Sequence, residues 1–140
     1  MDITRNREAI RKLLQGARTI AVVGASPNPT RDSHRIGQYL ISAGYEVIPV
    51  NPQYAEIHGV RCYPTVAAIG RPVDIVDVFR RPEFAGEVVD DAIAAGAKCV
   101  WFQLETADKA EADRADAAGL ATVRNACTMV VHRQHGIGKA

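Results

Sequence analysis

The feature of this sequence that most limits its fold is a glycine followed, four residues later, by a β-branched residue. This spacing recurs at Gly16 and Ile20, Gly44 and Ile48, Gly96 and Val100, and Gly119 and Val123. A glycine just after a helix can take the left-handed conformation that ends it, and a short apolar β-branched run is typical of a buried strand. The spacing therefore predicts a repeated unit of helix, glycine stop and strand.

The segments between these stops extend the alternation along the whole chain. Short β-branched and apolar runs predict five strands, at 19–24, 46–50, 74–79, 98–103 and 120–123. Apolar residues at helical spacing predict helices around 10–17, from 32 or 33 to 43, at 82–95 and at 107–118, with a short helix favoured within 128–140. The long connection 51–71 is predicted to hold only one short helix, around 65–69.

Alternating strands and helices predict a parallel sheet with helices on both faces. Each crossover helix must return the chain to the same end of the sheet before the next strand begins. A chain of 140 residues is about the size of one domain. We therefore expect residues 1–140 to form a single α/β domain, a Rossmann-like three-layer sandwich with a five-stranded, mainly parallel sheet.

Charge and composition narrow the classes of partner. Lys and Arg number 17 against 16 Asp and Glu, so no bulk field attracts nucleic acid or an anionic membrane, and any bound anion must be held locally. No apolar run approaches the roughly 20 residues that cross a bilayer, and residues 1–16 are charged throughout, so we expect a cytoplasmic protein. The three widely spaced cysteines predict reduced thiols. The pair His132 and His135 lacks a third ligand, and no metal is assigned.

Ligands of open parallel sheets bind beyond the carboxyl ends of the strands, near helix N-termini. The loop after the first predicted strand is the most informative there. Gly24 lets the backbone pass close to a ligand, while Ser26, Arg31 and Ser33 offer hydroxyls and a guanidinium. This loop favours a phosphate site. The alternative is that Gly24 only makes a tight turn and that Ser33 only caps the next helix.

Missing motifs narrow the kind of phosphate ligand. The fingerprint G-x-G-x-x-G is absent, because Gly24 is followed by Ala25, Ser26 and Pro27. Asn51 stands where an acidic residue would bind a ribose hydroxyl, so an ordinary NAD enzyme is disfavoured. The sequence also lacks a P-loop and a G-x-S-x-G elbow. A nucleotide with an added phosphate would suit the extra arginines.

Four motifs stand in order along the chain: 22–26 (VVGAS) with Arg31 and Ser33, 44–52 (GYEVIPVNP), 73–80 (VDIVDVFR) and 100–104 (VWFQL). They resemble the motifs of the single-domain CoA-binding proteins, which are similar to the N-terminal CoA-binding domain of the succinyl-CoA synthetase α-subunit. The resemblance runs from about residue 10 to residue 132. It implies a Rossmann-type, nucleotide-binding fold that binds coenzyme A as its cofactor, with no established reaction for the single-domain members.

The resemblance also implies which residues contact CoA. It places the phosphates and the adenosine near Gly24, Ala25, Ser26, Arg31 and Ser33. It places Asn51 and Pro52 at the nucleotide end, Phe79 and Arg80 at the next strand edge, and Gln103 and Cys127 on the pantetheine side. The chain departs from the family at two places. The family usually has glycine after Trp-x-Gln-Leu where this chain has Glu105, and it often has Asp-Arg before the cysteine matching Cys127 where this chain has Asn125 and Ala126.

The sequence thus predicts a protein that binds CoA or an acyl-CoA at the carboxyl edge of its sheet, without independent catalysis. One alternative is a small acyl-CoA- or nucleotide-dependent enzyme that uses Cys127. Another is a CoA-responsive regulatory protein that contacts a partner through residues 51–71. A protein partner or a homo-oligomer is compatible with each of these interpretations, and none involves nucleic acid or a membrane.

Overall fold

Five parallel strands form the central sheet. A computed structural model describes residues 1–137, and its large sheet contains β1 (Thr19–Val23), β2 (Glu46–Val50), β5 (Ile75–Val78), β6 (Cys99–Phe102) and β7 (Ala121–Arg124). The strand order is β2-β1-β5-β6-β7, and every pair of neighbours is parallel. The α/β Rossmann-like fold and the five-stranded sheet predicted from the sequence are confirmed, and each strand lies within the run predicted for it or extends one residue beyond it.

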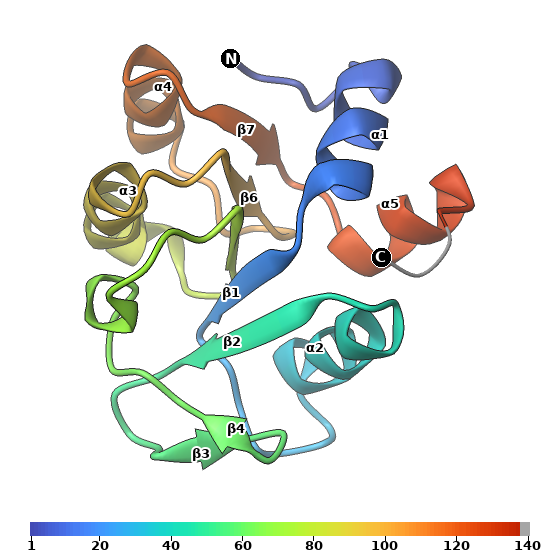
Figure 1. The fold of residues 1–140 in the computed structure, drawn as a ribbon. Coiled ribbons are helices and arrows are strands. Elements are labelled where there is room, and N and C mark those ends of the chain that lie inside the picture. Colours follow the sequence, from blue (N-terminus) through green and yellow to red (C-terminus); the bar gives the residue numbers. More distant parts are fainter. Residues whose placement is uncertain (138–140) are drawn as a thin grey trace.

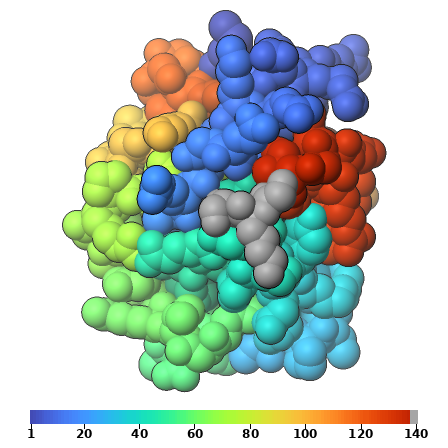
Figure 2. Space-filling view, turned by 45° about the vertical axis from the view of Figure 1, so that its right-hand side comes forward, coloured from blue at the N-terminus to red at the C-terminus, as the bar shows by residue number. Residues whose placement is uncertain are grey.

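Helices cover both faces of this sheet (Figure 1). Helices α1, α2 and α5 lie on one face and α3 and α4 on the other; their bounds are Arg7–Gly16, Asp32–Ser42, Thr128–His135, Ala85–Ala94 and Lys109–Ala117. In Figure 2, α1 (blue) and α5 (red) lie side by side on the surface, as they do in Figure 1. The helix predicted to start at Pro82 begins instead as a 3-10 turn, η2 (Pro82–Phe84), which leads into α3. Of the predicted C-terminal helix, residues 138–140 lie outside the described part of the chain.

The strands are apolar on both faces because both faces are buried. Leu14 of α1 and Leu40 of α2 pack in one core together with Trp101 of β6. Val89 of α3 packs in the other core with Val100, the strand neighbour of Trp101. All five side chains are less than 1% exposed. Such continuous burial is what a parallel sheet between two helical layers requires. Across residues 1–137, no helix combines the length and the apolar character that crossing a membrane takes.

The connection 51–71 holds more structure than the sequence predicts. Besides a 3-10 turn, η1 (Ala67–Ile69), it contains an antiparallel hairpin of β3 (Glu56–Ile57) and β4 (Val60–Arg61). The short helix predicted around 65–69 is therefore present as η1, but the expectation that the connection holds no other element was wrong. The two residues at the tip, His58 and Gly59, both have positive φ, as a tight hairpin turn requires. Strands of two residues are too short to leave an alternating pattern in the sequence.

The edge of the sheet at β7 is covered by the first residues of the chain. The backbone N–H of Ile3 donates to the carbonyl of Thr122 at 2.9 Å, and the N–H of Arg124 donates to the hydroxyl of Thr4 at 2.9 Å. These bonds satisfy edge groups of β7 that would otherwise be open to pairing with another chain.

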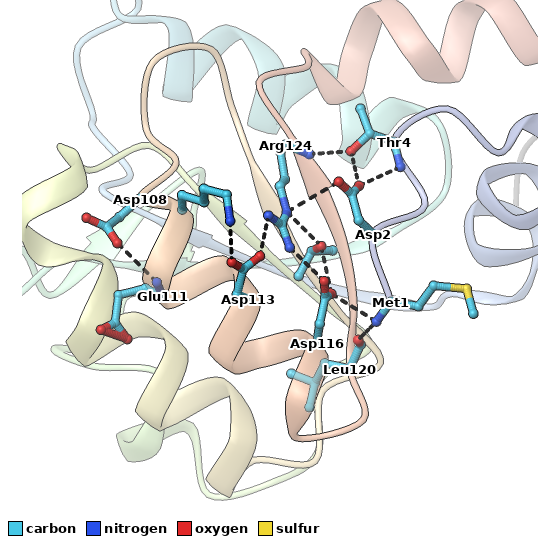
Figure 3. A network of polar contacts seen from close by, with 11 residues as sticks. Met1, Asp2, Thr4, Asp108, Glu111, Asp113, Asp116, Leu120 and Arg124 are labelled. Carbon is cyan, nitrogen blue, oxygen red and sulfur yellow. Dashed lines mark hydrogen bonds and ion pairs between the residues drawn. The ribbon is translucent and has the colours of Figure 1, made fainter.

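Arg124 connects this edge to α4 (Figure 3). Its guanidinium lies 2.9 Å from a carboxylate oxygen of Asp113, 2.6 Å from one of Asp116 and 3.6 Å from one of Asp2. The side chain is only 18% exposed, so solvent weakens these contacts less than it weakens most surface ion pairs. One guanidinium thus joins the N-terminal segment, α4 and β7.

We predict that Arg124→Ala lowers the free energy of unfolding by about 2–3 kcal/mol, because it removes the guanidinium that three carboxylates share and leaves only Lys109 beside Asp113 and the N-terminal ammonium beside Asp116. The matched control is Arg114→Ala, since Arg114 also pairs with two carboxylates but is 41% exposed. Its loss should cost less than about 1 kcal/mol. Urea unfolding followed by the fluorescence of the single tryptophan measures both. Equal losses in the two variants would contradict the role given to Arg124.

Candidate functional site

The strand order defines where loops converge. From β1 the chain crosses to β2 on one side and later returns to β5 on the other, and ligands of open sheets bind at this kind of switch point. Gly24, just after β1, has φ of +88°. A Cβ atom at this position would lie 3.2 Å from Cγ of Arg80 and 3.3 Å from the carbonyl carbon of Phe79. Both the conformation and the close approach therefore require glycine here.

Asn51 links the loop after β1 to the loop after β2. Its side-chain Nδ2 donates to the carbonyl of Ala25 at 2.9 Å, and its Oδ1 accepts from the backbone N–H of Gln53 at 2.9 Å. The N–H of Gly24 donates to the carbonyl of Val50 at 2.9 Å. Asn51 therefore fixes the relative position of two loops that both border the site.

The loop between β1 and α2 is ordered by its own short polar side chains. The Ser26 hydroxyl accepts from the N–H of Asn28 at 3.1 Å, and Asn28 Oδ1 accepts from the N–H and hydroxyl of Thr30 at 3.0 and 2.8 Å. His34 Nδ1 lies 2.9 Å from the carbonyl of Ser26. Such turns hold a loop in one shape without a hydrophobic core.

The N-terminus of α2 faces this loop without a side-chain cap. The residue at the cap position is Arg31, and its side chain makes no capping hydrogen bond. Ser33 lies within the first turn, so the alternative that it only caps the helix is wrong. The N–H groups of an uncapped first turn lack partners and carry partial positive charge. Arg31 itself is exposed and forms no ion pair within residues 1–137.

Two adjacent cavities lie at these strand ends, one of about 680 Å³ and one of about 240 Å³. Gly24, Asn51 and Gln53 line both. The larger cavity is lined by nine of the eleven residues predicted to contact CoA: Gly24, Ala25, Ser26, Arg31, Ser33, Asn51, Phe79, Gln103 and Cys127. The other two, Pro52 and Arg80, line the smaller cavity. The fold thus brings all eleven residues together, and their role in binding stays a prediction.

Several residues that line the cavities were missed from the sequence. The larger cavity adds Thr30, Asp32, Arg35, Ile36, Gln53, Tyr54, Leu104, Thr106 and Met129. The smaller adds Pro64, Thr65 and Val66 from the long connection and two carboxylates of α3, Glu87 and Asp91. The sequence signal that could have found Glu87 and Asp91 is their i,i+4 spacing, which places both acids on one face of the helix after the third predicted strand. Leu104, just after β6, is 60% exposed, and an exposed large apolar side chain at this edge of the sheet is a further indication of a binding site.

Arg80 and Arg81 differ clearly in their surroundings. The Arg80 guanidinium lies 3.9 Å from the centre of the Phe84 ring and 4.0 Å from a carboxylate oxygen of Glu87. These contacts orient it at the smaller cavity. Arg81 is 78% exposed and lines neither cavity.

Glu105, which replaces the family's usual glycine, has φ of +64°. This left-handed conformation explains why glycine suits the position. The N–H of Glu105 donates to Oδ1 of Asn125 at 2.9 Å, and Glu105 lines neither cavity.

A buried carboxyl group lies beneath the larger cavity. Asp77 of β5 is 0% exposed. Its Oδ1 accepts from Nε2 of Gln103 at 2.5 Å, and its Oδ2 accepts from the hydroxyl of Thr128 at 3.0 Å. No Lys or Arg within residues 1–137 forms an ion pair with it. Burial raises the pKa of Asp77 to about 7, even though both hydrogen bonds oppose the rise.

We predict that the unsubstituted protein becomes less stable than it is at low pH as the pH rises from about 4 to about 7. Its free energy of unfolding should fall over this range relative to that of the Asp77→Asn variant, which has no carboxyl group at this position. The folded-state pKa lies above the unfolded one, so in this window the unfolded chain releases its proton first and becomes relatively more stable. The full difference is on the order of 4 kcal/mol at most. Below this window both states are protonated and above it both are ionised, so the difference levels off. Urea unfolding at a series of pH values measures it, and a difference that is constant with pH would contradict the prediction.

Comparisons with known proteins place the chain in a family. A family model described as a CoA binding domain matches residues 18–133. The uncharacterised protein YneT of Bacillus subtilis is 34% identical over 127 residues, covering 91% of this chain and 94% of that protein. The structure of a hypothetical protein from Pyrococcus horikoshii OT3 superimposes with a TM-score of 0.91 at 43% identity, over 94% of this chain and 93% of the other.

A third relative matches through one region of a much longer enzyme. The ADP-forming acetate–CoA ligase I of Archaeoglobus fulgidus is 32% identical over 74 residues, which make up 53% of this chain and 11% of the ligase. The four sequence motifs predicted a relationship of this kind to a CoA ligase domain. The chain belongs to the CoA binding domain family, related to the corresponding region of ADP-forming acetate–CoA ligases.

Proposed function

We propose that the protein binds coenzyme A or an acyl-CoA across the two cavities at the switch point, without catalysing a reaction by itself. The observation that carries this proposal is the convergence of the uncapped N-terminus of α2, Arg31 and both cavities around Gly24. An elongated ligand with phosphates near its middle would use all of these features together.

The phosphates of CoA would lie at the N-terminus of α2. Backbone N–H groups of a first helical turn bind phosphate oxygens, and an arginine fork adds charged hydrogen bonds. Arg31 and Arg35 both line the larger cavity at this point, and of the two only Arg31 is free of an ion pair within residues 1–137, because Arg35 pairs with Asp32, which also lines the cavity. We assign Arg31 to the 3′-phosphate because it is exposed and forms no ion pair within residues 1–137.

The adenine would lie in the smaller cavity. Val23, Val50 and Val66 give that cavity apolar surface for a base, and Glu87 and Asp91 provide carboxylate oxygens. A carboxylate is a hydrogen-bond acceptor and suits the exocyclic amino group of adenine. The support for this assignment is the match between an apolar cavity with acceptors and a flat base with a donor edge.

The pantetheine arm would extend through the larger cavity toward β6 and α5. Phe79, Leu104 and Met129 give this part of the cavity an apolar character, and Gln103 adds an amide. Cys127, a free and half-buried cysteine directly before α5, lines the same cavity and would lie at the thiol end of the ligand.

We expect calorimetric titration to show binding of CoA and acetyl-CoA, and much weaker binding of NAD and ATP. NAD and ATP both lack the 3′-phosphate and the pantetheine arm of CoA, so each would leave part of the site unused. In parallel, acetyl-CoA incubated with the protein should release no more free CoA than it does in buffer. Tighter binding of NAD or ATP would contradict the proposed ligand. Repeated turnover of acetyl-CoA would contradict the absence of catalysis.

Arg31→Ala should weaken CoA binding by roughly 10- to 100-fold, the effect of losing a charged hydrogen bond. Dephospho-CoA, which lacks the 3′-phosphate, should be affected far less. Titration of both ligands measures the difference, with Arg81→Ala as the control because Arg81 lines neither cavity. Equal weakening of both ligands would move Arg31 to the pyrophosphate, and unchanged binding would exclude it from the site.

A further inference from the structure

The buried group formed by Asp77, Gln103 and Thr128 connects the core of the sheet to the larger cavity. Asp77 lies within β5, Gln103 directly follows β6 and Thr128 opens α5. Asp77, Gln103 and Thr128 are 0%, 5% and 1% exposed. Only Gln103 lines the larger cavity. It is therefore the member of the group through which the other two can act on a ligand.

When Asp77 is ionised, as it is at pH 8, the hydrogen bonds of this group allow one orientation of the Gln103 amide. An ionised carboxylate accepts only, so the atom of Gln103 that lies 2.5 Å from Asp77 Oδ1 must be the donor Nε2. Nε2 also donates to the Thr128 hydroxyl at 2.8 Å, while that hydroxyl donates its one proton to Asp77 Oδ2. Turning the amide over would place Oε1 against Oδ1 and break both of the bonds that Nε2 makes.

The other end of the amide, Oε1, is then directed at the cavity. No residue within 1–137 donates a hydrogen bond to it. The side-chain atoms of the described residues that are fully buried without a partner are Nε2 of His58 and Nε2 of His132, so Oε1 is accessible. An accessible acceptor with a fixed direction favours a donor and repels a phosphate or a carbonyl oxygen.

We propose that Asp77 is a positioning residue that orients Gln103, so that Oε1 accepts a hydrogen bond from an amide N–H of the ligand's pantetheine arm. This inference rests on the proposed binding of CoA and adds to it the chemistry of one contact. The carboxyl group acts only through Gln103, since Asp77 itself lines neither cavity.

The test is Asp77→Asn, titrated at pH 8 with CoA and with adenosine 3′,5′-bisphosphate, which lacks the pantetheine arm. Asn at position 77 can donate to Gln103 Oε1, so the amide is no longer restricted to one orientation. CoA binding should weaken roughly tenfold, the size of one lost hydrogen bond, and bisphosphate binding should not change. The matched control is Asp74→Asn. It makes the same chemical change just before β5, where Asp74 accepts from the N–H of Arg18 at 2.7 Å and lines neither cavity.

Two further variants separate orientation from stability. Adding Gln103→Glu to Asp77→Asn should restore most of the CoA affinity, because either oxygen of a carboxylate can face the cavity as an acceptor while the other accepts from the new Asn. If Asp77→Asn does not fold, Gln103→Met serves instead, and it should weaken CoA binding without affecting the bisphosphate.

Three results would overturn the inference. The first is unchanged CoA binding in Asp77→Asn, or in Gln103→Met where that variant replaces it. The second is equal weakening of CoA and the bisphosphate, which would mean that Asp77 only supports the fold. The third is the absence of rescue by Gln103→Glu. Failure of the unsubstituted protein to bind CoA is a separate outcome, which overturns the proposed function and this inference with it.

Discussion

The candidate site depends on the close approach of two strand ends at Gly24. The backbone there has positive φ, and any Cβ would come within 3.3 Å of atoms in the loop after β5. The strand order makes β1 and β5 neighbours, but only a residue without a side chain lets their loops come this close. Asn51 then joins the loop after β2 to the same point. The hydrophobic core places these strands side by side, and Gly24 and Asn51 convert that arrangement into a site.

Asp77 shows that the requirements of the core and of the site conflict. An apolar side chain of similar size would stabilise this position, because a buried carboxyl without a cation loses its hydration. The structure offsets part of this cost with the two hydrogen bonds from Gln103 and Thr128. Both donors lie at the end of the sheet where the larger cavity opens. The one polar break in an otherwise apolar strand therefore lies where it can act on a ligand, a position typical of local conflicts tolerated for function.

The sequence predicted those parts of the molecule that repeat with a short period. Helix stops and apolar runs located all five strands of the sheet and the helices. The shared edge of parallel strands located the loop after β1, and the resemblance to CoA-binding proteins indicated the other predicted residues around the cavities. The hairpin at 56–61 was missed because two-residue strands carry no period. Glu87 and Asp91 were missed because the face of α3 that borders a cavity depends on how the helix is rotated against the sheet. The partners of Asp77 are 26 and 51 residues away, a distance that no local pattern spans.

The near-zero net charge conceals a separation of charge within the site. The larger cavity contains Arg31 and the N-terminus of α2, together with Arg35 and its ion-pair partner Asp32, whereas two carboxylates line the smaller cavity beside Arg80. Without a bulk field, these local groups determine how a ligand lies. A base with an amino donor suits the acidic side, phosphates suit the basic centre, and an amide arm suits the acceptor Oε1 of Gln103. In the proposed binding mode a dinucleotide would place a second base where the pantetheine arm would be, so the order of donors and acceptors along the ligand, more than its charge, would distinguish CoA from NAD.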